Sequence, residues 1–161
     1  MGNSPLEYMP EHIRDRRIIL TTSSGTEAIE RVRDSPAVLV GSFLNLSAVT
    51  MAAKRLSKQM SQNITVALAG RLGEFSLEDF LCGGAMVEHL KEEADECSDS
   101  AYAAYLSYRA CKNNLLQCVL KGKHARNLVD LGLLRDVEFC CMLDRYDTVP
   151  LLKEGWIVKA A

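Results

Sequence analysis

The sequence contains no apolar run of the roughly 20 residues that a membrane-spanning helix requires, so we expect no membrane as a partner. Its first residues, Met-Gly-Asn-Ser-Pro-Leu-Glu, lack the basic and apolar regions of a secretory signal, which predicts a cytoplasmic protein. Neither sign of charge is in excess, because 19 basic and 21 acidic residues give a formal net charge of −2. Proteins that neutralise nucleic-acid phosphates are normally basic, so we do not expect a nucleic-acid partner.

The cysteine and histidine spacing of a zinc site is also missing. No Cys-x-x-Cys pair occurs among the six cysteines, and the three histidines are scattered. Without a secretory signal, we expect most cysteines to be reduced, small, buried side chains. A nucleophilic Cys82 is disfavoured because no histidine lies near it in sequence, and the adjacent Gly83 and Gly84 favour close helix packing instead.

The composition is that of one soluble globular domain. The 161 residues suffice for a core of their own, and 48% apolar with 25% charged residues is ordinary for this class. Short β-branched runs alternate with helical segments. Strands are predicted at 17–22, 37–41, 64–69, 137–143 and 156–158, and helices at 26–32, 46–60, 76–90, 100–121 and 125–131. This alternation predicts a single α/β domain over residues 1–161, with a mostly parallel sheet flanked by helices.

Polar loops follow the first three predicted strands, where ligands bind in open α/β sheets. The first loop passes into a helix N-terminus, whose free N–H groups and dipole favour an anion. Its residues are Thr21, Thr22, Ser23, Ser24, Gly25 and Thr26. Taken alone, they are more simply explained as a capped turn. The second loop repeats the pattern with Ser42 and Asn45, although Asn45 alone suits a helix cap better than a ligand contact.

The third loop brings a cation and two carboxylates close together in the sequence. It contains Gly70 and Arg71, and the helix that follows begins with Ser76 as its expected cap and continues with Glu78 and Asp79. Two carboxylates at one helix start can hold Mg²⁺ while the ion retains several waters. In isolation, acids that stabilise the positive end of the helix dipole are the simpler explanation.

A series of short motifs runs along nearly the whole chain. They are Gly2-Asn3-Ser4-Pro5, residues 20–26, Gly41-Ser42-Phe43-x-Asn45, Ala69-Gly70-Arg71, residues 78–84, Asp136-Val137-x-Phe139-Cys140, and Asp147 with Val149-Pro150. No single motif is specific, but their order and spacing resemble the 2-phosphosulfolactate phosphatases, Mg²⁺-dependent enzymes of coenzyme M biosynthesis.

The resemblance implies hydrolysis of a small anionic phosphorylated acid, 2-phosphosulfolactate, to sulfolactate and phosphate. It implies Asp79 and Glu78 near Mg²⁺ and Arg71 balancing charge on the phosphoryl group, as the catalytic set. The implied anion-binding set is Asn3, Ser4, Thr21, Thr22, Ser23, Ser24, Gly25, Thr26, Ser42, Asn45 and Gly70.

Two departures from the family pattern leave other functions open. The family has Thr-Thr-Asn-Gly-Thr in the first loop, where this chain has Ser24 in place of the Asn. The family also has an N-terminal region with an Asp-Val-Leu-Arg-Ala-Thr type segment, which these residues lack, so we expect an incomplete version of its fold. A non-catalytic anion-binding or assembly module is the main alternative, and an uncovered sheet edge would favour a homo-oligomer. A thiol redox protein would need one cysteine of low pKa.

Overall fold

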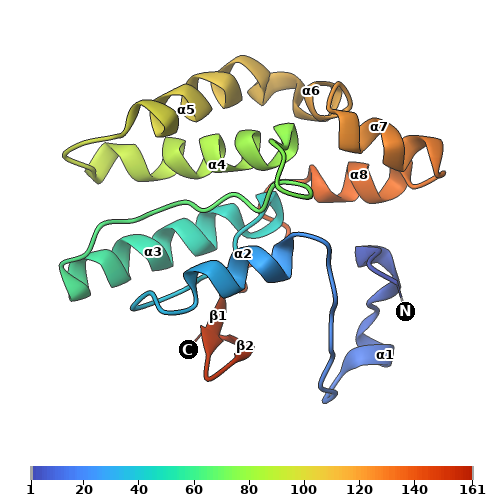
Figure 1. The fold of residues 1–161 in the computed structure, drawn as a ribbon, viewed down its shortest axis with the longest axis horizontal. Helices are drawn as coiled ribbons and strands as arrows, with labels where there is room; N and C mark the ends of the chain where they lie inside the picture. Colours follow the sequence, from blue (N-terminus) through green and yellow to red (C-terminus); the bar gives the residue numbers. More distant parts are fainter. Residues whose placement is uncertain (1, 161) are drawn as a thin grey trace.

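The computed structural model describes residues 2–160 and is built mainly of helices (Figure 1). Its α-helices are α1 (Pro10–Ile13), α2 (Gly25–Val32), α3 (Leu46–Met60), α4 (Leu77–Leu90), α5 (Asp99–Cys111), α6 (Leu115–Val119), α7 (Lys123–Asp130) and α8 (Leu134–Cys140). Short 3₁₀ turns are η1 (Pro5–Glu7), η2 (Phe43–Asn45), η3 (Lys91–Glu93) and η4 (Lys112–Asn114). Strands β1 (Pro150–Lys153) and β2 (Trp156–Lys159) form an antiparallel pair, which confirms the predicted strand at 156–158.

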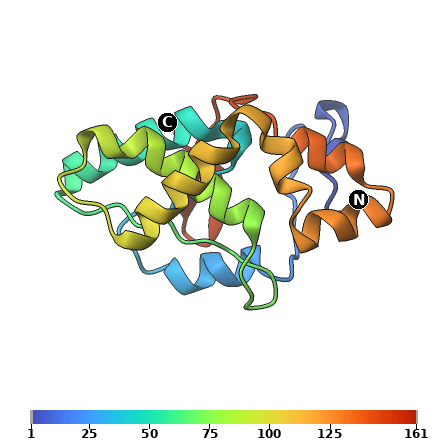
Figure 2. The same cartoon turned by 90° about the horizontal axis from the view of Figure 1, so that it is seen from above.

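The core is organised around α4. Leu81 of α4, Tyr108 of α5 and Leu46 of α3 are among the most completely buried side chains. Helices α4 and α5 lie side by side, as Figures 1 and 2 show from two directions. Gly84 permits this approach, because a Cβ atom there would lie only 2.0 Å from the carbonyl oxygen of Ala104. The preceding Gly83 faces the other way, toward Leu68, so the expected close packing is present on both sides of the helix.

Most predicted helices are confirmed, because apolar spacing is a local signal. Asn45 and Ser76 stand at the N-caps of α3 and α4 as predicted, but neither makes a side-chain capping hydrogen bond there. Helices α2, α3 and α4 fall where the sequence predicts them.

Helix α7 ends at Asp130 and is followed by Gly132, which has φ +79°. Leu133 N–H donates to the carbonyl of Leu128, which makes this a Schellman-type ending. The predicted helix at 100–121 is instead divided into α5, η4 and α6.

The predicted strand at 137–143 is wrong, because residues 134–140 form α8. A short apolar run does not distinguish a buried strand from a helix segment. Here Val137 alone of α8 is fully buried, and it packs into the core from one face of the helix. Tertiary packing of that single face therefore decides the conformation.

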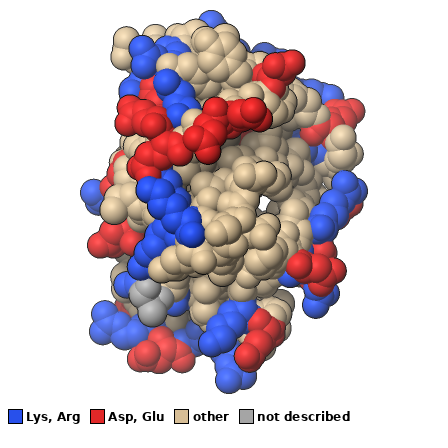
Figure 3. Space-filling model, turned by 90° about the vertical axis from the view of Figure 1, so that its left-hand side faces the viewer, with Lys and Arg blue, Asp and Glu red and all other residues tan. Residues whose placement is uncertain are grey.

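The other predicted strands are extended but do not form the expected parallel sheet. Val40 N–H donates to the carbonyl of Pro150, and Leu152 N–H to that of Val38, so segment 37–41 lies antiparallel to β1. Within residues 2–160, segment 64–69 makes no backbone hydrogen bond to another segment, and 17–22 runs exposed on the surface. One face of the molecule is hollowed and uncharged at its centre, with charged residues around it (Figure 3).

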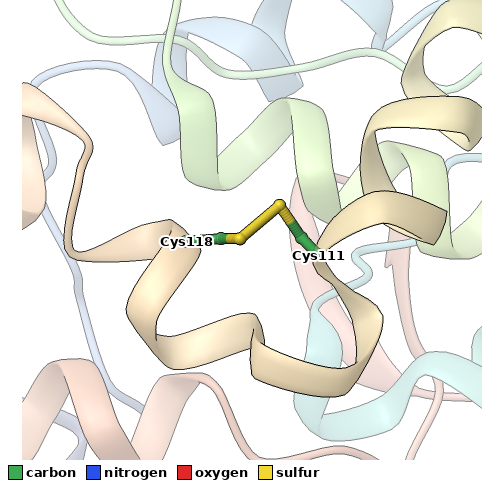
Figure 4. Close-up of a disulfide and its surroundings, with 2 residues drawn as sticks. All are labelled: Cys111 and Cys118. Atoms are coloured by element: carbon green, nitrogen blue, oxygen red, sulfur yellow. A yellow bond between two sulfur atoms is a disulfide. The ribbon is translucent and has the colours of Figure 1, made fainter.

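The cysteine expectation holds in part. Cys82, Cys97, Cys140 and Cys141 are reduced, but Cys97 and Cys140 are exposed and Cys82 and Cys141 are only partly buried. Cys111 and Cys118 form a disulfide across the η4 turn, with their Cα atoms 5.9 Å apart (Figure 4). The break between α5 and α6 brings the two thiols together, which an uninterrupted helix would not do at this spacing.

No helix among the described residues has both the length and the apolar character to cross a membrane.

The α4–α5 contact predicts opposite outcomes for two adjacent glycines. Gly84→Ala should lower the free energy of unfolding by about 1–3 kcal/mol, because the new methyl group meets rigid backbone of α5. Gly83→Ala is the matched control, since its methyl group would meet the flexible end of Leu68 at 2.9 Å and gain helix propensity. Urea unfolding measures both, and equal destabilisation would contradict the packing described.

Candidate functional site

The candidate site begins at the N-terminus of α4. Asp79, in its first turn, accepts a hydrogen bond at 2.7 Å from the backbone N–H of Gly70. This bond ties the start of the helix to the loop that follows segment 64–69. The sequence predicts that these two features belong together, and the structure places them in contact.

Gly70 and Arg71 begin a tight turn whose first position requires glycine. Gly70 has φ +65°, and a Cβ atom there would lie 2.6 Å from the carbonyl oxygen of Glu74. The backbones of Arg71 and Glu74 exchange two hydrogen bonds, at 3.0 and 2.9 Å, which close the turn. The half-buried Arg71 makes no ion pair with any residue that the structure describes.

The first predicted loop lies against this turn. Leu72 N–H donates to Ser24 Oγ at 3.0 Å, which joins the two loops. Thr22 Oγ1 accepts from the N–H of Thr26 at 2.9 Å, so this hydroxyl serves the first turn of α2, as the capped-turn interpretation predicts. Ser23 is exposed, and Gly25 begins α2.

Asn45 is engaged entirely within the protein. Its Oδ1 accepts from Ser42 N–H at 2.8 Å and from the Ser42 hydroxyl at 3.1 Å, while its Nδ2 donates to the carbonyls of Thr148 and Val40. With both ends of the amide paired and only 7% of the residue exposed, Asn45 is suited to holding the loop in place. Direct contact with an anion would require breaking these bonds.

The N-terminal motif Gly2-Asn3-Ser4-Pro5 makes hydrogen bonds to two of the other motifs that carry the family resemblance. Asn3 Nδ2 donates to the carbonyl of Thr21 at 3.2 Å, and Ser4 Oγ donates to Asp136 Oδ1 at 2.7 Å. These bonds hold the first residues against segment 17–22 and α8. They place Asn3 beside the first loop, while Ser4 is directed toward α8.

Sequence reasoning missed His124. Its Nδ1 lies 2.9 Å from Oε1 of Glu78, although 46 positions separate the two residues. His124 stands in the first turn of α7, just after the buried Gly122, whose Cα faces the Glu78 carboxylate. No local pattern marks this contact, because only the fold of α4 against α7 creates it.

The two adjacent carboxylates have different environments. Burial raises the pKa of Asp79, and the neighbouring charge of Glu78 raises it further, while the Gly70 N–H opposes both. Burial also acts to raise the pKa of Glu78, but hydrogen bonds from its own backbone, Ser76 and His124 outweigh it and lower that pKa. Neighbouring acids with divergent pKa values are typical of catalytic sites.

Cys82 is not an activated thiol. Burial raises its pKa to about 12, the charge of Asp79 one turn earlier adds to this, and a hydrogen bond with the Phe43 backbone opposes it. The thiol therefore stays protonated at neutral pH, which disfavours a nucleophilic or redox role. Its contact with Phe43 also places the second loop close to the start of α4.

The carboxylates partly fit a magnesium ion. Among residues 2–160, no three histidine, cysteine or acidic side chains gather as a ready-made metal site. Glu78 is directed toward His124, whereas Asp79 is directed toward Gly70. Mg²⁺ often takes only one or two protein carboxylates and completes its shell with waters and substrate phosphate. The oxygen donors of Asp79 and Glu78 suit that mode.

Comparison with known proteins identifies the family. The family model described as 2-phosphosulpholactate phosphatase matches residues 1–155. The chain belongs to the 2-phosphosulfolactate phosphatase family. Two relatives, each named probable 2-phosphosulfolactate phosphatase, come from Thermotoga petrophila (43% identical over 155 residues) and Caldanaerobacter subterraneus subsp. tengcongensis (41% over 156). The alignments cover 96% of this chain but 65% and 63% of those relatives, so it spans just under two thirds of their length.

The divergent pKa values predict opposite stability effects at the two carboxylates. In EDTA at pH 7, Asp79→Asn should leave the free energy of unfolding unchanged or raise it by about 0.5–1 kcal/mol, because the amide oxygen still accepts from Gly70 and the costly charge is gone. Glu78→Gln should lower it by roughly 0.3 kcal/mol, because charge-assisted hydrogen bonds are weakened but solvent already screens this partly exposed carboxylate.

The stability effects of the two substitutions should change differently with pH. The pKa of Glu78 is lower in the folded state, so its contribution is complete above the unfolded-state pKa and disappears as pH falls through the folded-state pKa. For Asp79 the folded-state pKa is the higher one, so the gain from Asp79→Asn shrinks as acid protonates the carboxyl. Thermal unfolding from pH 7 to pH 3 measures both, and effects of the same sign would refute the assignment.

Proposed function

We propose that this chain acts as a Mg²⁺-dependent phosphatase that hydrolyses 2-phosphosulfolactate to sulfolactate and phosphate. The observation that carries the proposal is the hydrogen bond between Asp79 and Gly70 N–H, because it sets a carboxylate beside the loop that bears Arg71. Membership of the family and the names of its relatives support the substrate. The link to coenzyme M biosynthesis rests on the sequence resemblance alone.

The proposed site suits a substrate with phosphate, carboxylate and sulfonate groups. Arg71 has a guanidinium group free of ion pairs among the described residues, and such a group favours a bidentate contact with phosphate. The N-terminus of α2, with the exposed Ser23 before it, offers hydroxyl and backbone donors to a second anionic group. The two loops are joined at Ser24, so these donors lie on one part of the surface.

Hydrolysis forms a bond from a water oxygen to phosphorus and breaks the ester P–O bond, and a proton moves to the leaving oxygen. Arg71 would balance the negative charge on the phosphoryl oxygens as this bond breaks. Glu78, oriented by His124, stays ionised, whereas the buried Asp79 carries its charge at a cost. Mg²⁺ held by these carboxylates would supply Lewis-acid stabilisation and a more acidic bound water.

A non-catalytic anion-binding or assembly module is the second candidate. It is favoured by the directions of the two carboxylates, because Glu78 is directed toward His124 and Asp79 toward Gly70. Such a module would bind a phosphorylated acid through the same loops without turning it over. The two functions therefore differ in turnover, and a direct assay separates them.

Turnover should depend on Asp79 and on the metal. We expect phosphate release from 2-phosphosulfolactate with Mg²⁺ and none with EDTA. Asp79→Asn should lower kcat/KM by about 100-fold or more, because a charged group at the reacting centre is removed while the Gly70 hydrogen bond is kept. Asp95→Asn, at an exposed position, is the matched control. Full activity of Asp79→Asn would reject the assignment, and no release by the folded wild type would favour the module.

His124 should act as a positioning residue. His124→Ala should lower kcat by about 10-fold with little change in KM, because Glu78 loses the partner that orients it, and losing a hydrogen bond to a metal-binding carboxylate typically costs this much. His124→Gln, whose amide can donate to Glu78, should recover part of the loss. Steady-state kinetics with circular dichroism as the folding control test this. A change in KM alone would show that His124 contacts substrate instead.

A further inference from the structure

An apolar groove of about 560 Å³ runs through the middle of the molecule. Segments 37–41 and 64–69 both line it, as do Cys82, Gly83 and Met86 of α4. Apolar side chains of α2 and α3, such as Ile29 and Leu56, line the rest. At the left of Figure 1, where α3 and α4 end, the molecule presents the hollowed, uncharged surface seen in Figure 3.

Both sides of the groove carry unpaired strand edges. Val38 and Val40 use their backbone groups to bond β1, and the bridge pairs Leu39 with Leu151. Because successive residues of a strand alternate, the N–H and C=O of Leu39 are directed away from β1, toward the groove. The backbone of 64–69 bonds no other described segment. An apolar groove between two such edges matches a β-strand that is buried on both faces.

One segment of this chain has the composition, length and attachment that the groove requires. Residues 17–22 are extended and equal in number to 64–69. Their apolar centre is exposed to solvent, with Ile18 at 41%, Ile19 at 86% and Leu20 at 51%. Exposed consecutive apolar residues of this kind mark a surface that is normally covered.

The attachment of this segment points the same way. Segment 17–22 leads through Thr22–Ser24 into Gly25, which lines the groove beside Asp79 and Ala69. Helix α2, which follows, already faces the groove through Ala28, Ile29 and Val32. A strand, the helix that packs on it and a parallel strand at 37–41 would form a βαβ unit.

We propose that residues 17–22 insert into this groove as a strand parallel to 37–41 and 64–69, completing a mixed sheet with β1 and β2. Insertion buries Ile18, Ile19 and Leu20 and pairs the free edges on both sides. It breaks the bond between Asn3 and the Thr21 carbonyl and unwinds η1 and α1, which lie in the stretch that must extend. The twelve residues between Ser4 and Arg17 can span roughly 40 Å when extended, enough to return along a six-residue strand of about 20 Å without releasing Ser4 from Asp136.

Insertion would also change the candidate site, and this consequence rests on the proposed function. Its end delivers Thr21 and Thr22 between the loop of Gly41 and the loop of Gly70. The three polar loops would then converge at one edge of a sheet, beside Asp79. In this arrangement the hydroxyls of the first loop reach the same anion as Arg71.

Hydrogen exchange of the wild-type chain, read by mass spectrometry, tests the insertion without relying on activity. We expect amides of 18–22 and of 65–69 to exchange at least 100-fold more slowly than those of the exposed loop at 94–98. Fast exchange at 18–22 would overturn the proposal, whatever 65–69 does. Protection that disappears on dilution, with a dimer by native mass spectrometry, would also overturn it, because the strand would then come from a second copy.

A proline variant supplies an independent test. Ile19→Pro removes an N–H that bonds nothing in the exposed segment but would pair in a central strand. We expect its Tm to fall by about 5 °C or more, as loss of a buried ladder bond in a chain of this size implies. Glu96→Pro, in another exposed segment, is the control. Equal Tm values for the two variants would refute the insertion. If phosphate is released while 17–22 exchanges fast, only the insertion is overturned. If 17–22 is protected but no phosphate is released, only the phosphatase function is overturned.

Discussion

The hydrogen bond from Gly70 N–H to the Asp79 carboxylate is the contact on which the candidate site depends. It fixes the tight turn of Arg71 against the start of α4, and through Leu72 and Ser24 it also fixes the loop before α2. Burial makes the charge on Asp79 unfavourable, and Glu78 beside it adds repulsion. A carboxylate kept at such a cost is typical of a site that binds a cation or reacts, rather than of a helix-stabilising acid.

Helix α4 is the common support of every part of this arrangement. Gly84 brings α5 into backbone contact, Gly83 faces segment 64–69, and Glu78 reaches α7 through His124. The first turn of the helix therefore carries the polar groups, while its later turns carry the core. Displacement of α4 would therefore disturb the packing and the candidate site together.

The sequence predicts those features that depend on local signals. Apolar spacing locates α2, α3 and α4, and Gly132 follows the end of α7. The loop of Gly70 and the acids of α4 are recognised as one site because a few residues separate them. The contact of His124 with Glu78 and the helical conformation of 134–140 escape prediction, because long-range packing creates both. The Cys111–Cys118 disulfide depends in the same way on the break at η4. The predicted parallel sheet is not present in the described residues, because segment 37–41 pairs antiparallel with β1 and segment 64–69 bonds no other segment.

In the proposed function, the charge of Asp79 binds a cation. Calorimetric titration of Mg²⁺ into the wild type and into Asp79→Asn tests this most directly, because it needs neither substrate nor turnover. The account predicts Mg²⁺ binding by the wild type and binding at least 10-fold weaker in the variant, with the fold unchanged. Equal affinity in the two proteins, or no binding to either, would contradict it.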